Sequence, residues 1–600
     1  MERINIARVD HIASGSAIFI DSDTFNVSDE DKKHATDPLY QLKSRYVFKG
    51  CEIRIPAEIL KNKNLNALMV RMNISPTEIS ALLETIISEC GGDPSNIHLS
   101  YNYSYRSREE AVREVATDIK ENFKVDFPLG LHWDGKIMVD IDDSNTKVER
   151  LPVHVSDSKG GTKLLGVPKL MVGDAPGLAG TNIANATYDL LKEWELEEKI
   201  ATMNFDTTST NTGHISGGCI CIQKIIGRPL LWNACRKHVG EVHISKAWDI
   251  LNVETSSGPE IGIFNRFKNN FNLIPLATSK KQLFDINSVE SKHKVFFSDQ
   301  RLFVISTLKE VQKKGAYKRD DYKELINLVL MYLGENENYE IHKPGATHKA
   351  RWLMKLLHTL KIVMLEKSLP NMIFGRSKRM SVQIKRFVLF LVFCYVPWWF
   401  TCPIATSAAR NDILFYQTMC NFQDIDNEIS KAVKTSIQHH QWYIVSEMIP
   451  LALFDKGLDN SDKDKLAKKI MCYPRKECFE SRHGQGFGKP IFQKNVPINI
   501  VDAVYSADVW IFFEILKIPT DFLKSPPQTW NTNKSYLDSL EKVSNLKVCN
   551  DVAERGVKLI QDFISQKKDE EKVQNTLQVV EDDRSVRPNL RKRANKQDTN

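Results

Sequence analysis

The chain has 600 residues, 42% hydrophobic and 26% charged, which is the composition of a globular protein. This length exceeds what one hydrophobic core usually organises, so we expect two to four domains. The net charge of +7 permits a nucleic-acid partner without requiring one. The 11 scattered cysteines exclude a disulfide framework, and the polar N-terminus lacks the apolar stretch of a signal peptide, so we expect a reducing compartment.

Residues 1–125 form a mixed N-terminal region. A helix is predicted over Met72–Cys90, because Ser75 and Glu78 have the spacing of a capping box. A second helix is predicted over Arg106–Phe123. Two helices with a linker would suit either a small DNA-contacting module or a supporting subdomain, and the sequence leaves both alternatives open.

Residues 126–254 alternate between strand and helix patterns. Strands are predicted at Leu129–Met138, Val148–Val155, Lys163–Val172, Ala201–Thr208 and Pro229–Ala234. Helices are predicted at Leu178–Ile200, Gly217–Ile226 and Val239–Val253. Three strands, a helix, a strand, a helix and a strand is the order of an RNase H-like fold, and the short connections are typical of α/β units. The predicted class is therefore α/β.

Residues 255–540 have a helical pattern throughout, and we interpret them as an all-helical insertion into the α/β core. Predicted helices include Asp320–Leu333, His348–Leu365, Asp412–Met419, Ile429–Met448 and Ala507–Leu516. Residues 541–566 contain a last helix, Asn550–Gln566, which would complete the core. Residues 567–600 are charged and poor in aromatic residues, so we expect a disordered tail.

One uncharged segment, Phe387–Ile404, has 18 residues and reaches the lower limit for a membrane span. The alternative is a buried helix that ends at Pro397, with Trp398 and Trp399 in a protein core. We expect the buried helix, because no other segment has a membranous pattern.

Two aspartates stand at the ends of predicted strands. Asp134 follows the apolar strand LGLHW, and Asp206 follows ATMNF. An unpaired buried carboxylate is costly, and binding a metal is one reason to keep it there. Either residue alone would also suit a turn or a helix cap. Both would lie at adjacent strand ends of an RNase H-like sheet, where two divalent metal ions can drive phosphodiester transfer.

Four motifs resemble DDE transposases of the branch that includes hAT, P-element and Kolobok elements. They are HWDGK at 132–136, NFDTTSTNTG at 204–213, WNACRKH at 232–238 and NDVAERGVKL at 550–559. The resemblance implies that Asp134, Asp206 and Glu554 are catalytic and together bind Mg²⁺ or Mn²⁺. It covers residues 126–565, and a helical insertion separates the third and fourth motifs, as in those families.

The resemblance also implies residues near the site. Cys235 and His238 match the family's C/DxxH signature, and Arg351 and Trp352 lie in ATHKARW, which is similar to a basic and aromatic stretch of such insertions. The implied partners are transposon ends and target DNA, with a homo-oligomer acting in the nucleus and no membrane. An N-terminal zinc finger, common in these enzymes, is missing from residues 1–125.

Other interpretations of these residues remain. The cysteine and histidine of the signature would form half of a zinc site if Cys219 and Cys221 completed it. Asp551 and Asp562 are rivals of Glu554 on the same predicted helix. We interpret Glu241 and Asp249 as solvated charges on a helix. Cys472, Cys478 and His483 form a loose cluster in a loop, and their spacing matches no standard metal site.

Three basic runs would suit DNA phosphates, although most such runs are solvated faces: Lys343–Lys355, Arg376–Arg386 and Arg584–Lys596, of which the last also suits nuclear import. The leading hypothesis is a metal-dependent transposase that cleaves and joins DNA. The alternatives are a domesticated, inactive DNA-binding descendant and, from Phe387–Ile404 alone, a membrane protein.

Overall fold

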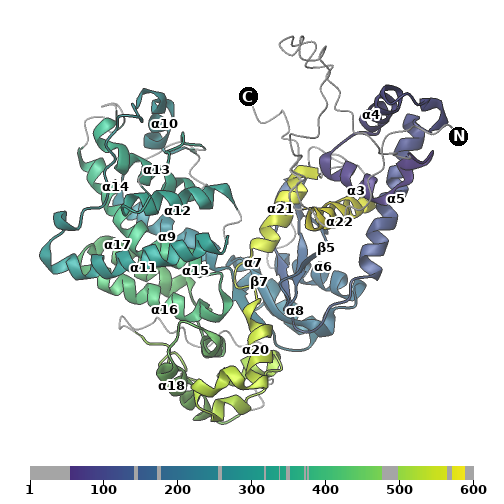
Figure 1. Ribbon diagram of the computed structural model, residues 1–600. Coiled ribbons are helices and arrows are strands. Elements are labelled where there is room, and N and C mark those ends of the chain that lie inside the picture. Colours follow the sequence, from purple (N-terminus) through teal and green to yellow (C-terminus); the bar gives the residue numbers. More distant parts are fainter. Residues whose placement is uncertain are drawn as a thin grey trace. The chain divides into compact units, whose positions relative to one another are not determined.

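The structure is a computed structural model that divides the chain into two compact units (Figure 1). Met1–Phe123 and Phe563–Asn600 form one, named the terminal unit here, and Lys124–Asp562 form the central unit. The residues described are 55–140, 146–171, 178–254, 260–315, 319–336, 338–345, 347, 352–369, 373, 378–475, 498–563 and 570–587.

The described part of the terminal unit is helical. Its longer helices are α3 (Lys63–Met72), α4 (Pro76–Glu89), α5 (Tyr101–Glu121) and α22 (Glu570–Val586). The predicted capping box of α4 is confirmed: the Glu78 N–H donates to Ser75 Oγ at 3.1 Å, and the Ser75 N–H donates to Glu78 Oε2 at 2.7 Å. Helix α5 begins five residues before the predicted start, because Ser100 caps it there.

Helix α22 corrects the expectation of a disordered tail over residues 570–586, whereas residues 588–600 of that predicted tail lie outside the described residues. It packs against α3 and α5, and Val573, Leu577 and Val580 are buried. Buried Arg71 of α3 pairs with Asp583 at 3.1 Å. The apolar residues recur at helical spacing within a charged segment, so composition alone concealed an amphipathic helix that needs a partner surface.

The central unit contains a mixed five-stranded sheet in the order β5-β4-β1-β7-β8. The strands are β1 (Leu129–Trp133), β4 (Val153–Ser156), β5 (Thr162–Gly166), β7 (Ile200–Phe205) and β8 (Leu231–Ala234). Strand β4 is antiparallel to both neighbours, whereas β1, β7 and β8 are mutually parallel. Helices α6 (Ala179–Glu193) and α8 (Gly218–Ile226) precede β7 and β8. The predicted α/β class is confirmed.

Each of the first three predicted strands is in fact two strands. Their other halves, β2 (Lys136–Val139), β3 (Lys147–Arg150) and β6 (Lys169–Met171), form a second sheet in the order β2-β3-β6. The breaks contain Gly135, Pro152 and Pro168. Proline lacks the N–H that a central strand needs, and glycine permits a sharp change of direction. The expectation of three long strands was wrong for this reason.

The two faces of the five-stranded sheet differ in polarity. One face carries Leu131, Met203, Trp232 and the ring of Trp133 stacked on Phe205, whose centroids are 5.6 Å apart. The other face carries a row of buried polar side chains: His132, His154, Ser156, Thr202, Asn204 and Asn233. Such alternation usually marks a sheet with one solvated face. Here the polar face is buried as well.

Between β8 and α21 (Asp551–Phe563), the described residues form helices and turns and no strand, as predicted for the helical region. Its helices gather mostly in one bundle (Figure 1). They are α9 (Arg236–Leu251), α10 (Gly262–Asn269), α11 (Lys294–Lys313), α12 (Asp320–Tyr332), α13 (Trp352–Leu365), α14 (Lys378–Phe390), α15 (Val396–Thr401), α16 (Ala405–Asn421), α17 (Asn427–His440), α18 (Asn460–Met471), α19 (Val509–Ile515) and α20 (Lys534–Ser544).

The apolar segment Phe387–Ile404 lies in this bundle. The helical run Arg379–Thr401 is long and apolar enough to cross a membrane by length and composition, but most of its apolar window is buried by protein. Trp398 and Trp399 are 4% and 1% exposed, which confirms the predicted burial. The predicted helix end at Pro397 was wrong. A π-helical turn, Leu391–Tyr395, precedes the proline and places it in the first turn of α15, where no N–H is needed.

Candidate active site

The parallel pairing of β1 with β7 brings the two predicted catalytic aspartates to the same edge of the sheet. In the register of this pair, His132 lies opposite Asn204. Two positions further along, just beyond the last residue of each strand, Asp134 and Asp206 follow. Because side chains alternate along a strand, both aspartates belong to the polar face of the sheet.

Glu554 reaches this edge on α21, and Asn550 anchors the start of that helix. The Asn550 amide Nδ2 donates to the Trp133 carbonyl at 2.7 Å, and its Oδ1 lies 3.3 Å from His132 Nδ1. Its backbone N–H donates to the Cys235 thiol at 3.1 Å. The helix that carries Glu554 therefore begins at the end of the strand that precedes Asp134.

Two of the three predicted catalytic carboxylates lie close enough to the third for their charges to act on it. Burial, followed by the charges of Asp206 and Glu554, raises the pKa of half-buried Asp134 to about 7. Glu554 keeps accessible surface, but the surrounding protein desolvates it and raises its pKa, and the charge of Asp551 raises it further. The structure thus brings Asp206 and Glu554 into electrostatic range of Asp134.

Two further carboxylates belong to this group, and the sequence analysis missed both. Burial, then the charge of Glu554, raises the pKa of half-buried Glu241 on α9 to about 7, so it is not a solvated helix charge. Glu149 on β3 lies against Gly135, where an added Cβ would clash with its Oε1. Burial and the charge of Asp206 raise its pKa. Neither residue stands in a motif that marks it in the sequence.

Asp206 also has the local role of a turn aspartate. Its Oδ1 accepts hydrogen bonds from the Thr208 hydroxyl at 2.8 Å and from the Asn211 amide. Asn211 in turn accepts from the Trp133 indole N–H at 2.8 Å. Asn211 therefore connects the end of β1 to Asp206, a positioning role that the motif NFDTTSTNTG contains but does not reveal.

The signature Cys235-x-x-His238 lies at the start of α9, and its two inner residues, Arg236 and Lys237, each form an ion pair. Arg236 pairs with Asp412 of α16 at 2.8 Å, and both side chains are fully buried. His238 is half-buried and lies near His440 at the end of α17. Its predicted place near the site remains a prediction.

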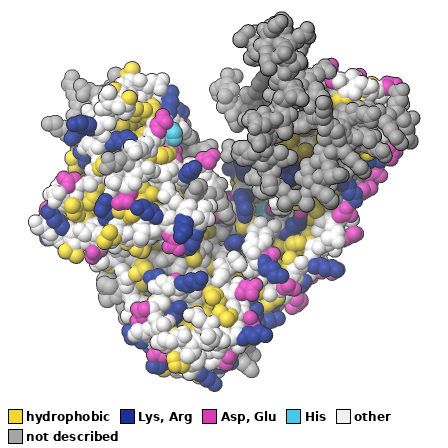
Figure 2. Space-filling view, viewed as in Figure 1, with side chains coloured by type: hydrophobic (Ala, Val, Ile, Leu, Met, Phe, Trp, Pro, Cys, Tyr) yellow, Lys and Arg dark blue, Asp and Glu magenta, His cyan; other side chains and the backbone are white. Residues whose placement is uncertain are grey.

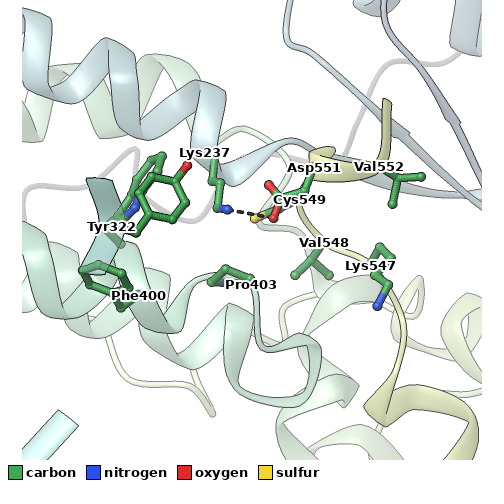
Figure 3. A pocket seen from close by; sticks show the side chains of 10 residues that line it. Lys237, Tyr322, Phe400, Pro403, Lys547, Val548, Cys549, Asp551 and Val552 are labelled. Carbon is green, nitrogen blue, oxygen red and sulfur yellow. Dashed lines mark hydrogen bonds and ion pairs between the residues drawn. The ribbon is translucent and has the colours of Figure 1, made fainter. Parts of the chain in front are cut away.

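The ion pair between Lys237 and Asp551 distinguishes Glu554 from Asp551 as a candidate metal ligand. The Lys237 ammonium lies 2.7 Å from Asp551 Oδ2, and Figure 3 shows the two side chains directed at each other. The ammonium also lies 5.3 Å from the ring centre of Tyr322 and 5.6 Å from that of Trp399. Because Asp551 already has a cation, Glu554 is the better candidate for a metal ligand.

A cavity of about 230 Å³ adjoins this ion pair. Its wall is mainly apolar and comes from α9, α12, α15 and the start of α21 with the segments beside them (Figure 3). The lining residues are Lys237, Tyr322, Trp399, Phe400, Pro403, Lys547, Val548, Cys549, Asp551 and Val552.

The cysteine beside Cys235 is not one of the two, Cys219 and Cys221, that the zinc alternative requires. Cys549 lies beside Cys235, and the Cys402 and Cys549 sulfurs are 4.0 Å apart. Among the described residues, no three His, Cys, Asp or Glu side chains already have the arrangement of a metal site, the carboxylates included. In the loose cluster, Cys472 is exposed, whereas Cys478 and His483 lie outside the described residues.

The predicted DNA-contacting residues have mixed surroundings. Arg351 lies outside the described residues, and half-buried Trp352 packs on Trp399 with ring centres 4.2 Å apart. In the basic run before the apolar segment, Lys385 pairs with Glu366, and Arg386 pairs with two acidic residues, Asp426 and Glu428. On the face shown in Figure 2, Lys and Arg side chains are scattered among Asp and Glu.

No family model matches the chain, and no curated protein is detectably similar to it.

Proposed function

We propose that this protein is a DDE-type DNA strand transferase with an RNase H-like core, whose substrates are transposon ends and target DNA. The proposal includes action as a homo-oligomer in the nucleus. The strand order supports the core assignment, because three antiparallel strands are followed by two parallel ones that pair on the side of β1. The helical region then occupies the position of the insertion expected between the signature and Glu554.

One observation carries the proposal. Asp134 and Asp206 end two adjacent parallel strands in register, and α21 brings Glu554 into electrostatic range of Asp134. The glutamate is 348 residues further along the chain than Asp206, since 554 − 206 = 348. A structural carboxylate normally acquires a cationic partner, because a buried unpaired charge is costly. Instead, burial and the charges of Asp206 and Glu554 raise the pKa of Asp134, and Lys136 opposes them.

The donor set fits a hard divalent cation. Carboxylate oxygens are the ligands that Mg²⁺ and Mn²⁺ prefer, and Asp134, Asp206 and Glu554 would hold the ions, with Glu149 and Glu241 nearby. When bound, such ions activate an attacking oxygen and neutralise charge on the leaving oxygen. The side chains must first move closer together, because they are not yet arranged as ligands.

The remaining roles belong to the protein itself. Asn211 orients Asp206 through a hydrogen bond, and Lys237 neutralises Asp551 so that the latter does not compete with Glu554. Lys237 and Arg319 also favour the charged form of Glu554. The protein therefore holds the carboxylates at one edge, where a DNA phosphate would meet them.

The test is nicking of a supercoiled plasmid with Mg²⁺ or Mn²⁺, beside a gel shift on the same DNA. We expect the wild type to nick, and Asp134→Asn, Asp206→Asn and Glu554→Gln to lose nicking while DNA binding persists. Each substitution removes a charged ligand without a large change of shape. Asp464→Asn, on the exposed face of α18 and paired with Lys468, is the matched control.

Equal nicking by the wild type and Asp134→Asn would contradict the catalytic assignment. A wild type that binds DNA but does not nick it, with either metal ion, would favour the domesticated DNA-binding protein instead.

A further inference from the structure

Asn550 is a buried amide that joins three parts of the chain that are distant in sequence. Its side chain bonds to the end of β1 at both atoms, through the Trp133 carbonyl and His132. Its backbone N–H bonds to Cys235, at the start of α9. Its carbonyl accepts the N–H of Glu554 at 3.3 Å, in the first turn of α21. Only 3% of the residue is exposed.

The residue does not act as an ordinary helix cap. An asparagine just before a helix usually accepts a hydrogen bond from the backbone of the first turn with its side-chain oxygen. Here Oδ1 faces His132 and Nδ2 donates to Trp133, so both polar atoms of the side chain bond to β1. The orientation of the amide is determined by these two partners, one a donor and one an acceptor.

The position of these contacts matters for the carboxylates. Trp133 directly precedes Asp134, and Glu554 lies one helical turn after Asn550. A change at Asn550 would therefore alter the relation between the strand end and the helix, although the residue is not one of the acidic side chains.

We propose that Asn550 is a positioning residue for the metal ligands, because it fixes the start of α21, which carries Glu554, against the end of β1, which precedes Asp134. This inference rests on the proposed function. Residues that orient metal ligands through hydrogen bonds typically contribute about 10–100-fold to metal affinity or activity. The amide needs both its donor and its acceptor, so an isosteric carboxylate at this position would not replace it.

The experiment compares Asn550→Ala and Asn550→Asp with Asn545→Ala. Asn545 belongs to the same segment, but its side chain donates to the Ser158 carbonyl at 2.8 Å, beyond the end of β4. The measurements are Mn²⁺ binding by electron paramagnetic resonance, the Mn²⁺ concentration for half-maximal plasmid nicking, the KM for plasmid and the metal-free melting temperature.

We expect both Asn550 variants to bind Mn²⁺ about tenfold more weakly or worse and to need correspondingly more Mn²⁺ for nicking. The KM for plasmid should change less than about twofold, because phosphate contacts are made by other residues. Asn545→Ala should lower the melting temperature without a change in Mn²⁺ affinity.

Several results would overturn the inference. If Mn²⁺ affinity falls in the Asn550 and Asn545 variants alike, in proportion to melting temperature, Asn550 is merely structural. Unchanged Mn²⁺ affinity in Asn550→Ala would exclude the positioning role even if nicking is absent. A wild type that binds Mn²⁺ without nicking would defeat only the proposed function, whereas a wild type that binds no Mn²⁺ would defeat both.

Discussion

At the residue scale, the main feature of the candidate site is a group of carboxylates that lie close to one another. Asp134 and Glu241 each have a pKa raised to about 7, above the ordinary values near 4. Burial is the main cause in both, and the neighbouring acidic charges add to it. By contrast, the fully buried Arg236 and Asp412 form an ion pair. The crowded acids are therefore a destabilising feature that a cation would relieve.

This crowding predicts how stability depends on pH in metal-free buffer. In the unfolded chain Asp134 titrates near pH 4, and in the folded protein near pH 7. Between these values the folded state binds more protons at Asp134, so the contribution of this group to the free energy of unfolding falls as pH rises from 4 to 7. Asp134→Asn removes this titration and should flatten that fall, as urea unfolding at several pH values would measure.

The effect of Mg²⁺ on the melting temperature is a second test of the same carboxylates. At pH 8, Mg²⁺ should raise the melting temperature of the wild type, because it binds the folded state, and should do so less in Asp134→Asn. If the stability of the wild type and of Asp134→Asn depends on pH in the same way between pH 4 and 7, the raised pKa of Asp134 is contradicted.

At the element scale, the decisive contact is the docking of α21 on the polar face of the sheet. Gly556 permits it, because an added Cβ would lie 2.5 Å from His154 Cε1 and 2.7 Å from Pro152 Cβ. Asn550 anchors the start of the helix, and Glu554 lies between the two points. The helix thus approaches the sheet closely on both sides of its candidate catalytic residue.

Gly556→Ala should displace α21 from the sheet. The added methyl group overpacks the contact, at a cost of about 1–3 kcal/mol in the free energy of unfolding. Nicking should fall by more than this loss of folded protein explains, because Glu554 moves with the helix. Lys558→Ala, on the exposed side of α21, is the control and should change stability by less than about 0.5 kcal/mol. Normal nicking and stability in Gly556→Ala would exclude a close approach at this point.

At the scale of the whole molecule, the two compact units each contain a buried ion pair of the same kind. Arg71 and Asp583 form the pair of the terminal unit, and Arg236 and Asp412 form that of the central unit. The first pair joins α3 to α22, from opposite ends of the chain. Removal of one partner from such a pair leaves an unpaired buried charge.

We expect calorimetry to resolve two unfolding transitions. Asp583→Asn should lower only the transition of the terminal unit, and Asp412→Asn only that of the central unit, each by about 3–5 kcal/mol in the free energy of unfolding. Limited proteolysis would assign each transition to its unit. A single transition that both variants shift equally would show that the chain unfolds as one cooperative body.

Features encoded over short stretches could be predicted from the sequence. The capping box of Ser75 and Glu78 joins residues three positions apart, and the placement of Asp134 and Asp206 at strand ends follows from apolar runs that stop there. These features depend on residues a few positions apart in the chain, so the local sequence pattern is enough to predict them.

Only the tertiary structure decided which distant segments meet. Asn550, Gly556 and Glu241 have no local pattern of their own, and their roles arise from docking between segments hundreds of residues apart. The same reason explains α22, whose apolar stripe is too sparse to stand out from its charged sequence but is buried once α3 and α5 cover it. Such docking sums many weak contacts over a surface, and no short stretch of sequence contains that sum.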